Sequence, residues 1–430
     1  MFEKIFRLKK SNTNPRTEII AGLTTFMTMA YILALNPSIL SDTGMDKSAL
    51  FTATALSACL ATLIMAFWAR LPFALAPGLG LNGFFAYTVV LKMGYTWQMA
   101  LTAVFIEGII FIVLTSFNIR EAIINSIPAN LKHAISAGIG LFIALLGLKN
   151  AGIVQGDEKT LLSLGDMSNH GVWIAFAGIM VTGVLMILRV RGALLIGIFV
   201  STVAGIPLGV TRYPEGGLID LPPSIDPIFF RFDFSKIFTL DMLIVLFTFL
   251  FVDMFDTVGT LIGVSGKAGM LDSRGNIPRA KQALFADAIG TTAGAILGTS
   301  TVTTYVESAS GVAEGGRTGM TAFSVAVLFA LSLFCAPLFL MVPSAATAPA
   351  LIIVGLFMLS PLQKVNLENI EEALPVFLTI IIMPLTLSIS EGIIFGMLSY
   401  VFLKIFTGKY REVSLVMYIL SLFFILKFFM

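Results

Sequence analysis

Apolar residues fill most of this chain in long runs that short polar segments separate. Because the hydrocarbon core of a bilayer is about 30 Å thick, a helix needs roughly 20 apolar residues to cross it. A further apolar run at 413–429 ends the chain, and the pattern leaves open whether it crosses the bilayer or lies in the interface. Before that run, the pattern predicts fourteen membrane-spanning segments at residues 17–40, 49–69, 73–91, 99–117, 131–149, 172–189, 192–210, 241–264, 280–297, 299–316, 318–340, 343–360, 371–388 and 389–407.

Two of the predicted segments are interrupted. Segment 73–91 contains proline and glycines near its start and has Asn82 at its centre, and segment 299–316 is rich in Thr, Ser and Gly with Glu307 near its middle. Irregular, polar backbone is tolerated at membrane depth only where it is buried in protein or lines a cavity. Two interrupted crossings in corresponding places of two halves point to the substrate site of a transporter.

Composition and charge support a membrane transporter. The chain is 57% hydrophobic and 12% charged, with a mean hydropathy of +0.94, which excludes an ordinary soluble globular protein. With a cytoplasmic N-terminus, the inner segments hold 19 Lys and Arg residues and the outer segments hold 7, which is the positive-inside pattern. We see no signal peptide or organelle-targeting segment, so we expect a multi-pass protein of the plasma membrane. Cys59 and Cys335 lie in apolar segments and are read as buried hydrophobes.

The two halves of the chain echo one another. Ile127-Pro128 opens a segment that ends in Gly138–Gly152 (GIGLFIALLGLKNAG), and Val342-Pro343 opens one that contains Leu351–Asn366 (LIIVGLFMLSPLQKVN). The two dipeptides are offset by 215 residues, which is half the chain. Seven crossings is an odd number, so the second half enters the membrane from the opposite side. The sequence therefore predicts an inverted-topology repeat of seven plus seven segments.

Four polar residues fall near the middle of predicted segments. Asp253 and Asp256 lie three residues apart on segment 241–264, hence on one helical face, and they join Asn82 and Glu307 at similar depth. A charge at the bilayer centre costs about 2.5–3.5 kcal/mol on insertion scales, so such residues are expected to be functional. Carboxylates and an amide suit a planar, neutral, hydrogen-bonding solute. Asp253, Asp256 and Glu307 are also the candidates for binding a coupling proton, because burial and like charge favour the protonated form.

Aromatic residues accompany Asn82. Phe84, Phe85 and Tyr87 follow it closely and are candidates to stack on a flat ring, although packing is the more frequent role of such side chains.

Other acids inside or beside the segments carry weaker expectations. Glu107 is either a coupling group or a helix-packing group, and Asp287 is expected to pair with Arg or Lys at the inner edge. Glu314 and Arg317 are three residues apart and are expected to form a local ion pair.

At these residues the chain resembles the nucleobase–cation symporter 2 family, in its AzgA-like branch of purine permeases for hypoxanthine, guanine and adenine. The resemblance covers essentially the whole chain from Thr17–Pro37 onward, and three stretches carry it: APGLGLNGFFAY (Ala76–Tyr87), FVDMFDTVGTLIGVS (Phe251–Ser265) and GTSTVTTYVESASGVAEGGRTG (Gly298–Gly319).

The resemblance implies an all-α polytopic fold with broken helices in segments 3 and 10. It implies a core domain (residues 1–117 and 241–340), a gate domain (118–210 and 341–411) and a hydrophobic tail (412–430). It also implies that Asn82, one or both of Asp253 and Asp256, and Glu307 contact a purine or couple the proton. An alignment on the following Thr-Val-Gly favours Asp256, and the depth of Asp253 in its segment keeps that residue open.

We therefore predict import of purine nucleobases by proton symport, with alternating access to a midplane site. The expected partners are a purine base, a proton and the lipid bilayer; a homodimer is compatible with the sequence, and we expect no cofactor, metal or nucleic acid. An anion permease of the same fold is the nearest alternative, and three midplane acids count against it. An intramembrane enzyme using Asp253 and Asp256 is disfavoured, because residues three apart on one helix are poorly placed to share a proton.

Overall fold

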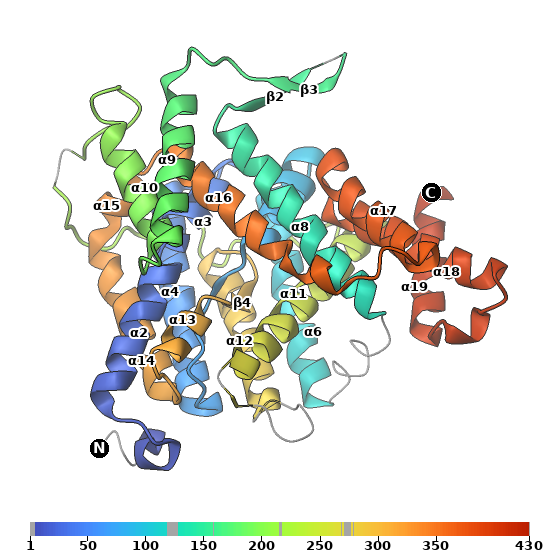
Figure 1. Cartoon of the computed structure of the whole chain (residues 1–430), viewed down its shortest axis with the longest axis horizontal. Coiled ribbons are helices and arrows are strands. Elements are labelled where there is room, and N and C mark those ends of the chain that lie inside the picture. Colours follow the sequence, from blue (N-terminus) through green and yellow to red (C-terminus); the bar gives the residue numbers. More distant parts are fainter. Residues whose placement is uncertain are drawn as a thin grey trace.

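The computed structural model is built almost entirely of helices, with two short two-stranded sheets (Figure 1). It describes residues 5–117, 128–157, 159–214, 217–267, 269–270, 277 and 279–429. Within these residues, nine helices are long and apolar enough to cross a membrane. The prediction of an all-α polytopic membrane protein is confirmed.

The helices and strands follow the predicted segments closely. The first half contains η1 (Leu8–Ser11), α2 (Pro15–Met29), α3 (Ile32–Ser41), α4 (Lys47–Ile64), η2 (Met65–Ala69), β1 (Leu75–Pro77), α5 (Leu79–Gly83), η3 (Phe84–Lys92), α6 (Trp97–Ser116), α8 (Ala129–Asn150), β2 (Val154–Asp157), β3 (Leu161–Leu164), α9 (His170–Ile187) and α10 (Ala193–Ala204). The second half contains α11 (Leu240–Lys267), α12 (Ala280–Leu297), β4 (Val302–Thr304), α13 (Ser308–Ala313), α14 (Gly319–Ser332), η4 (Leu333–Cys335), α15 (Ala336–Leu340), α16 (Ser344–Met358), η5 (Ser360–Lys364), α17 (Ile370–Thr386), α18 (Ile389–Phe406), η6 (Tyr410–Glu412) and α19 (Leu415–Phe429).

Many helices begin where the sequence offers a capping side chain. A side-chain oxygen at the residue before the helix accepts a hydrogen bond from a backbone N–H of the first turn, which would otherwise lack a partner. The capping residues are Asn14 for α2, Asp46 for α4, Thr96 for α6, Asn169 for α9, Thr318 for α14, Asn369 for α17 and Ser388 for α18.

The helices form two packed groups. In the first bundle, α2, α4 and α6 pack against α12 and α14, and α11 and α13 join them. In the second bundle, α8, α9 and α10 pack against α16, and α17 packs against α8 and α18. Each bundle therefore combines helices from both halves of the chain. The division into core and gate domains stays a prediction, and residues 118–127, where its first boundary falls, lie outside the described part of the chain.

An inverted repeat is visible where α8 crosses α16. A Cβ atom on Gly140 would lie 2.6 Å from the carbonyl oxygen of Gly355, and a Cβ on Gly355 would lie 2.4 Å from the carbonyl oxygen of Gly140. Gly355 follows Gly140 by 215 positions, the offset that the sequence echo predicts. Each glycine thus occupies the same place relative to the other, as a two-fold relation between the halves requires.

The segments on the side opposite the N-terminus are ordered. Strands β2 and β3 pair antiparallel and form the hairpin that projects from the helices at the top of Figure 1, whereas the N-terminus lies at the bottom. Residues 217–239 lie against the first bundle: Thr52 donates to the carbonyl of Pro223 at 2.8 Å, and the Asp233 N–H donates to Thr102 Oγ1 at 2.8 Å.

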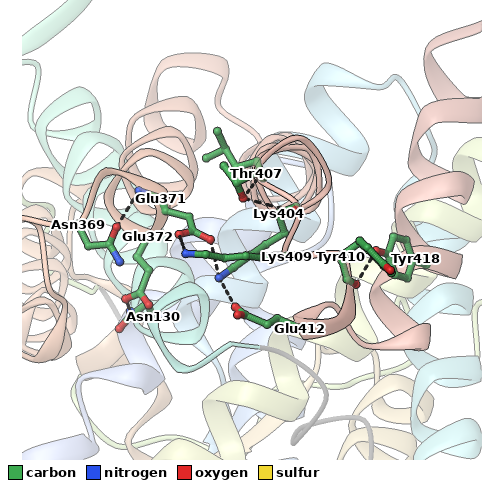
Figure 2. Close-up of polar contacts among 11 residues, drawn as sticks. Asn130, Asn369, Glu371, Glu372, Lys404, Thr407, Lys409, Tyr410, Glu412 and Tyr418 are labelled. Atoms are coloured by element: carbon green, nitrogen blue, oxygen red, sulfur yellow. Dashed lines mark hydrogen bonds and ion pairs between the residues drawn. The ribbon is translucent and has the colours of Figure 1, made fainter.

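The apolar tail forms helix α19, which packs on α18. The ring of Phe424 lies 5.4 Å from that of Phe247 on α11, so the tail reaches the depth of the predicted segments. Ion pairs join α17, the end of α18 and the segment that leads to α19 (Figure 2): Lys404 pairs with Glu371 at 2.6 Å and with Glu412 at 2.5 Å, and Lys409 pairs with Glu371 at 2.6 Å.

Candidate functional site

The two interrupted crossings meet in the middle of the first bundle. Strands β1 and β4 pair antiparallel in the register Leu75↔Thr304, Ala76↔Thr303 and Pro77↔Val302, and each strand leads into a short helix, α5 or α13. The Gly78 N–H donates to the carbonyl of Thr301 at 2.9 Å, and the Tyr305 N–H donates to the carbonyl of Ala74 at 2.9 Å. Extended backbone survives at this depth because each break satisfies the hydrogen-bonding groups of the other.

Threonines on neighbouring helices provide further hydrogen bonds to the backbone of the two breaks, in the same way in both halves. On α4, Thr62 Oγ1 both donates to the carbonyl of Leu75 and accepts from its N–H, at 3.0 Å each. On α12, Thr291 Oγ1 donates to the carbonyl of Val302 at 3.0 Å and accepts from its N–H at 3.2 Å. In each half, one threonine hydroxyl thus bonds the backbone N–H and carbonyl on the strand edge that does not face the other strand. Neither threonine was singled out from the sequence, because both sit in ordinary apolar segments.

The predicted site residues gather around the paired breaks. Asn82 lies on α5, is fully buried and accepts a hydrogen bond from Ser300 Oγ, just before β4. Glu307 immediately precedes α13 and accepts a hydrogen bond from the Tyr31 hydroxyl at 2.5 Å. Asp256 lies within electrostatic range of Glu307. The structure therefore brings residues from three predicted segments to one place.

The two aspartates of α11 have different surroundings. Asp253 is fully buried, and its Oδ1 lies 3.2 Å from the Thr257 hydroxyl. Asp256 is only partly buried, as is Glu307. The side chains of Asp256 and Glu307 are thus the accessible acids at the breaks, while Asp253 lies within the packed helices.

Two tyrosines that the sequence analysis did not select belong to this site. Tyr31 occupies a break in the first crossing, between α2 and α3, from which its hydroxyl reaches Glu307. The Tyr305 hydroxyl donates to the carbonyl of Pro77 at 2.5 Å and so links the two breaks. A lone tyrosine in the middle of an apolar segment was the available signal for Tyr31, whereas Tyr305 is hidden in the polar run of its segment.

The aromatic residues near Asn82 are engaged in packing. Phe84 and Phe85 are fully buried, and the ring of Phe84 lies edge-on to Phe249 with centroids 4.9 Å apart. The Tyr87 hydroxyl donates to Asp42 Oδ2 at 2.8 Å and accepts from Asn150 at 3.3 Å. Stacking of these rings on a ligand stays a prediction.

The expected ion pair between Glu314 and Arg317 is wrong. Glu314 instead pairs with Arg191 of the second bundle at 2.5 Å. The Arg317 guanidinium donates to the carbonyls of Val312 at 2.6 Å and Gly316 at 2.8 Å. Carbonyls at the end of a helix lack partners within the helix, and a nearby cation is a favourable donor for them.

Two further buried acids contact threonines. Glu107 accepts a hydrogen bond from Thr301 at 2.7 Å, which attaches α6 to the second break. Asp287 of α12 accepts from the Thr257 hydroxyl at 2.7 Å.

Comparisons with known proteins agree with this arrangement. Residues 16–395 match the profile of the Permease family. The chain is 45% identical to the adenine permease AdeP of Escherichia coli (99% of this chain, 96% of AdeP) and 46% identical to the guanine/hypoxanthine permease PbuG of Bacillus subtilis (98% of each chain).

Solved structures share the fold. The transmembrane domain of the cyanobacterial bicarbonate transporter BicA superposes with a TM-score of 0.67 at 15% identity, over 89% of this chain and 97% of that domain. A solved structure at this low identity shows the fold alone. The family is shown by the profile, which matches residues 16–395, and by the relatives at 45–46% identity. The chain is thus a transporter and not an enzyme, and it belongs to the Permease family, among the nucleobase–cation symporter 2 transporters.

Proposed function

We propose that this protein imports purine nucleobases by proton symport, with the base held between the two breaks. The observation that carries the proposal is the meeting of two partly exposed acids, Asp256 and Glu307, at the paired breaks. The substrate class in the proposal comes from relatives named adenine and guanine/hypoxanthine permeases. Carboxylates accept hydrogen bonds from ring N–H and exocyclic amino groups, which purines offer.

Asn82 supports a base as the ligand. Its carbonyl oxygen is engaged by Ser300, while its amide nitrogen has no hydrogen-bond partner among the described residues. A buried donor without a partner is costly and calls for an explanation. A purine acceptor atom placed beside the breaks would provide the missing partner.

Two acids beside the breaks also weigh against the anion alternative. An anionic substrate requires a neutral or cationic site, and Asp256 and Glu307 would repel it when ionised. The similarity to a bicarbonate transporter concerns the fold alone.

We further propose that the first bundle is the core domain and the second bundle the gate domain, and that the N-terminus lies in the cytoplasm of a plasma-membrane protein. We also propose that the conformation is inward-open, with the Arg191–Glu314 ion pair still joining the two bundles on the inner side. Gly259 and Gly263 lie on α11 at helical spacing from Asp256 toward the inner end, both are exposed or nearly so, and nothing lies within 4 Å of a Cβ added to either. On the outer side the bundles are joined: Thr88 donates to the carbonyl of Leu387 at 2.9 Å, and Tyr87 contacts Asn150.

Uptake of labelled hypoxanthine into cells that lack their own purine carriers tests the proposal. We expect uptake that a protonophore abolishes and that unlabelled guanine or adenine, but not uracil, competes away. Asp256→Asn and Glu307→Gln are expected to abolish uptake. Asp241→Asn, at the exposed outer end of the same helix α11, is the matched control and should transport normally. Membrane-inserted protein that takes up no base would refute the nucleobase assignment.

A further inference from the structure

Behind the proposed substrate site, α11 and α12 hold two buried acids that share one hydroxyl group. The Thr257 oxygen Oγ1 lies 2.7 Å from Asp287 Oδ1 and 3.2 Å from Asp253 Oδ1. Asp253, Thr257 and Asp287 are all fully buried. Asp287 has no part in the substrate contacts proposed above.

The valence of these groups limits how they can be protonated. A threonine hydroxyl has one hydrogen to donate, and an ionised carboxylate can only accept. If both acids were ionised, the hydroxyl would serve one of them and turn a lone pair toward the other. Both contacts become hydrogen bonds when one carboxyl carries a proton, donates it to the Thr257 oxygen, and the hydroxyl donates to the other carboxylate. Burial and like charge favour the same state, because two neighbouring buried carboxylates resist double ionisation.

The charged groups around this trio increase the preference for a proton. Asp256 on α11 lies within electrostatic range of both Asp287 and Glu307. Glu107 faces the second break from α6, which packs against both α11 and α12. The described basic side chains of the packed helices have contacts elsewhere: Lys47 of α4 donates to the carbonyls of Leu340 and Val342, Lys281 of α12 donates to the carbonyl of Ser116, and Lys404 of α18 pairs with Glu371 and Glu412. Lys132, His133 and Lys149 lie toward the ends of α8.

We propose that Asp253, Thr257 and Asp287 bind one proton, in a site separate from the base-contacting acids, and that this proton is the one that accompanies the base. The inference rests on the proton symport proposed above. The fold supplies a connection to the substrate: Asp253 and Asp256 are one turn apart on α11. Asp287 is one turn from Thr291, whose hydroxyl holds Val302 of β4. Loss of the proton would therefore change the position of the second break relative to the substrate.

Infrared spectroscopy of the purified protein tests the site without transport. At neutral pH we expect the carbonyl stretch of a protonated carboxylic acid, lost in Asp287→Asn and shifted in Thr257→Val, with Thr257→Ser retaining it. Glu18→Gln is the matched control. Glu18 is a buried carboxylate outside the trio whose oxygens accept hydrogen bonds from three backbone N–H groups and a hydroxyl, and its replacement should leave the signal unchanged. A signal unchanged in both Asp287→Asn and Thr257→Val overturns the inference.

Base binding to the same purified protein tests the coupling. Proton and base bind cooperatively in a symporter, so raising the pH should weaken hypoxanthine binding by about tenfold, within the usual range of coupling between two sites. Asp287→Asn and Thr257→Val should bind hypoxanthine with little dependence on pH, and Thr257→Ser should restore the dependence. Unaltered pH dependence in both, or a dependence on sodium that Asp287→Asn removes, overturns the inference. Uptake in cells that ignores a protonophore would instead contradict the proposed symport, while the infrared signal would still report whether the trio holds a proton.

Discussion

The contact of Gly140 with Gly355 gives a sharp test of the repeat and of the second bundle. The two helices cross with backbone against backbone, which small residues permit in membrane proteins. In Gly140→Ala, the new methyl group would lie 2.6 Å from the Gly355 carbonyl oxygen, whereas ordinary contacts begin near 3.4 Å. The helices α8 and α16 would have to separate locally by about 0.8 Å, the difference between the two distances.

A matched variant isolates the cost of that separation. Gly183 lies on α9 of the same bundle, and nothing lies within 4 Å of a Cβ added to it. Gly183→Ala should stabilise the protein by about 0.8–1 kcal/mol, because alanine is the better helix former. Gly140→Ala gains the same amount and loses about 1–3 kcal/mol to overpacking. The difference between the two variants, about 1–3 kcal/mol, is therefore the cost of the contact alone.

The measurement is thermal or denaturant unfolding of detergent-solubilised protein, followed by the helical circular dichroism signal. We expect Gly183→Ala to unfold at or above the midpoint of the unmodified protein and Gly140→Ala clearly below Gly183→Ala. Because one separation relieves both clashes, the double variant of Gly140 and Gly355 should lose less stability than the sum of the single losses. Equal stability of Gly140→Ala and Gly183→Ala, or full additivity in the double variant, would show that the helices do not meet as described.

Three further predictions address other contacts. Glu18→Ala removes the acceptor for three backbone N–H groups and a hydroxyl, so amide hydrogen exchange at residues 317–321 should accelerate by about 100-fold, while exchange at the other capped helix starts stays unchanged. Tyr87→Phe removes the outer contacts of this hydroxyl, and we expect slower thiol labelling of Gly259→Cys from the inner side as outward-open molecules accumulate; unchanged labelling would contradict the closure. Lys404→Met removes the cation that Glu371 and Glu412 share, so the free energy of unfolding should fall by about 2 kcal/mol; an unchanged unfolding midpoint would contradict a stabilising role of these ion pairs.

The sequence analysis predicted the crossings and the breaks because membrane depth constrains composition strongly. A run of apolar residues or a Pro- and Gly-rich interruption has few alternatives in a bilayer, so the positions of Asn82 and Glu307 could be identified directly. The Glu314–Arg317 pairing failed for the opposite reason. Spacing along one segment gives no information about contacts with residues distant in the sequence, and Glu314 pairs with Arg191 of the second bundle.

The same reasoning explains what was missed at the site. Tyr31 and Glu307 are 276 positions apart, and no local pattern in either segment indicates that they meet. Asp287 was expected to find a cation at the inner edge, yet its described contact is with Thr257, a residue whose side chain is unremarkable in an apolar helix. Which of two equivalent-looking aspartates is accessible also depends on packing: helical spacing puts Asp253 and Asp256 on one face, and only the neighbouring helices separate them.

The paired threonines explain how irregular backbone can persist at the centre of this protein. Each strand at the breaks has two edges; one edge faces the other strand, and the second is served by Thr62 or Thr291, each donating to and accepting from the same residue. The threonines lie on α4 and α12, which pack against each other within the first bundle. These backbone hydrogen bonds of the breaks are therefore made within the first bundle. If the two bundles move against each other in the alternating access that the sequence predicts, the site can be exposed to either side while these backbone hydrogen bonds stay intact.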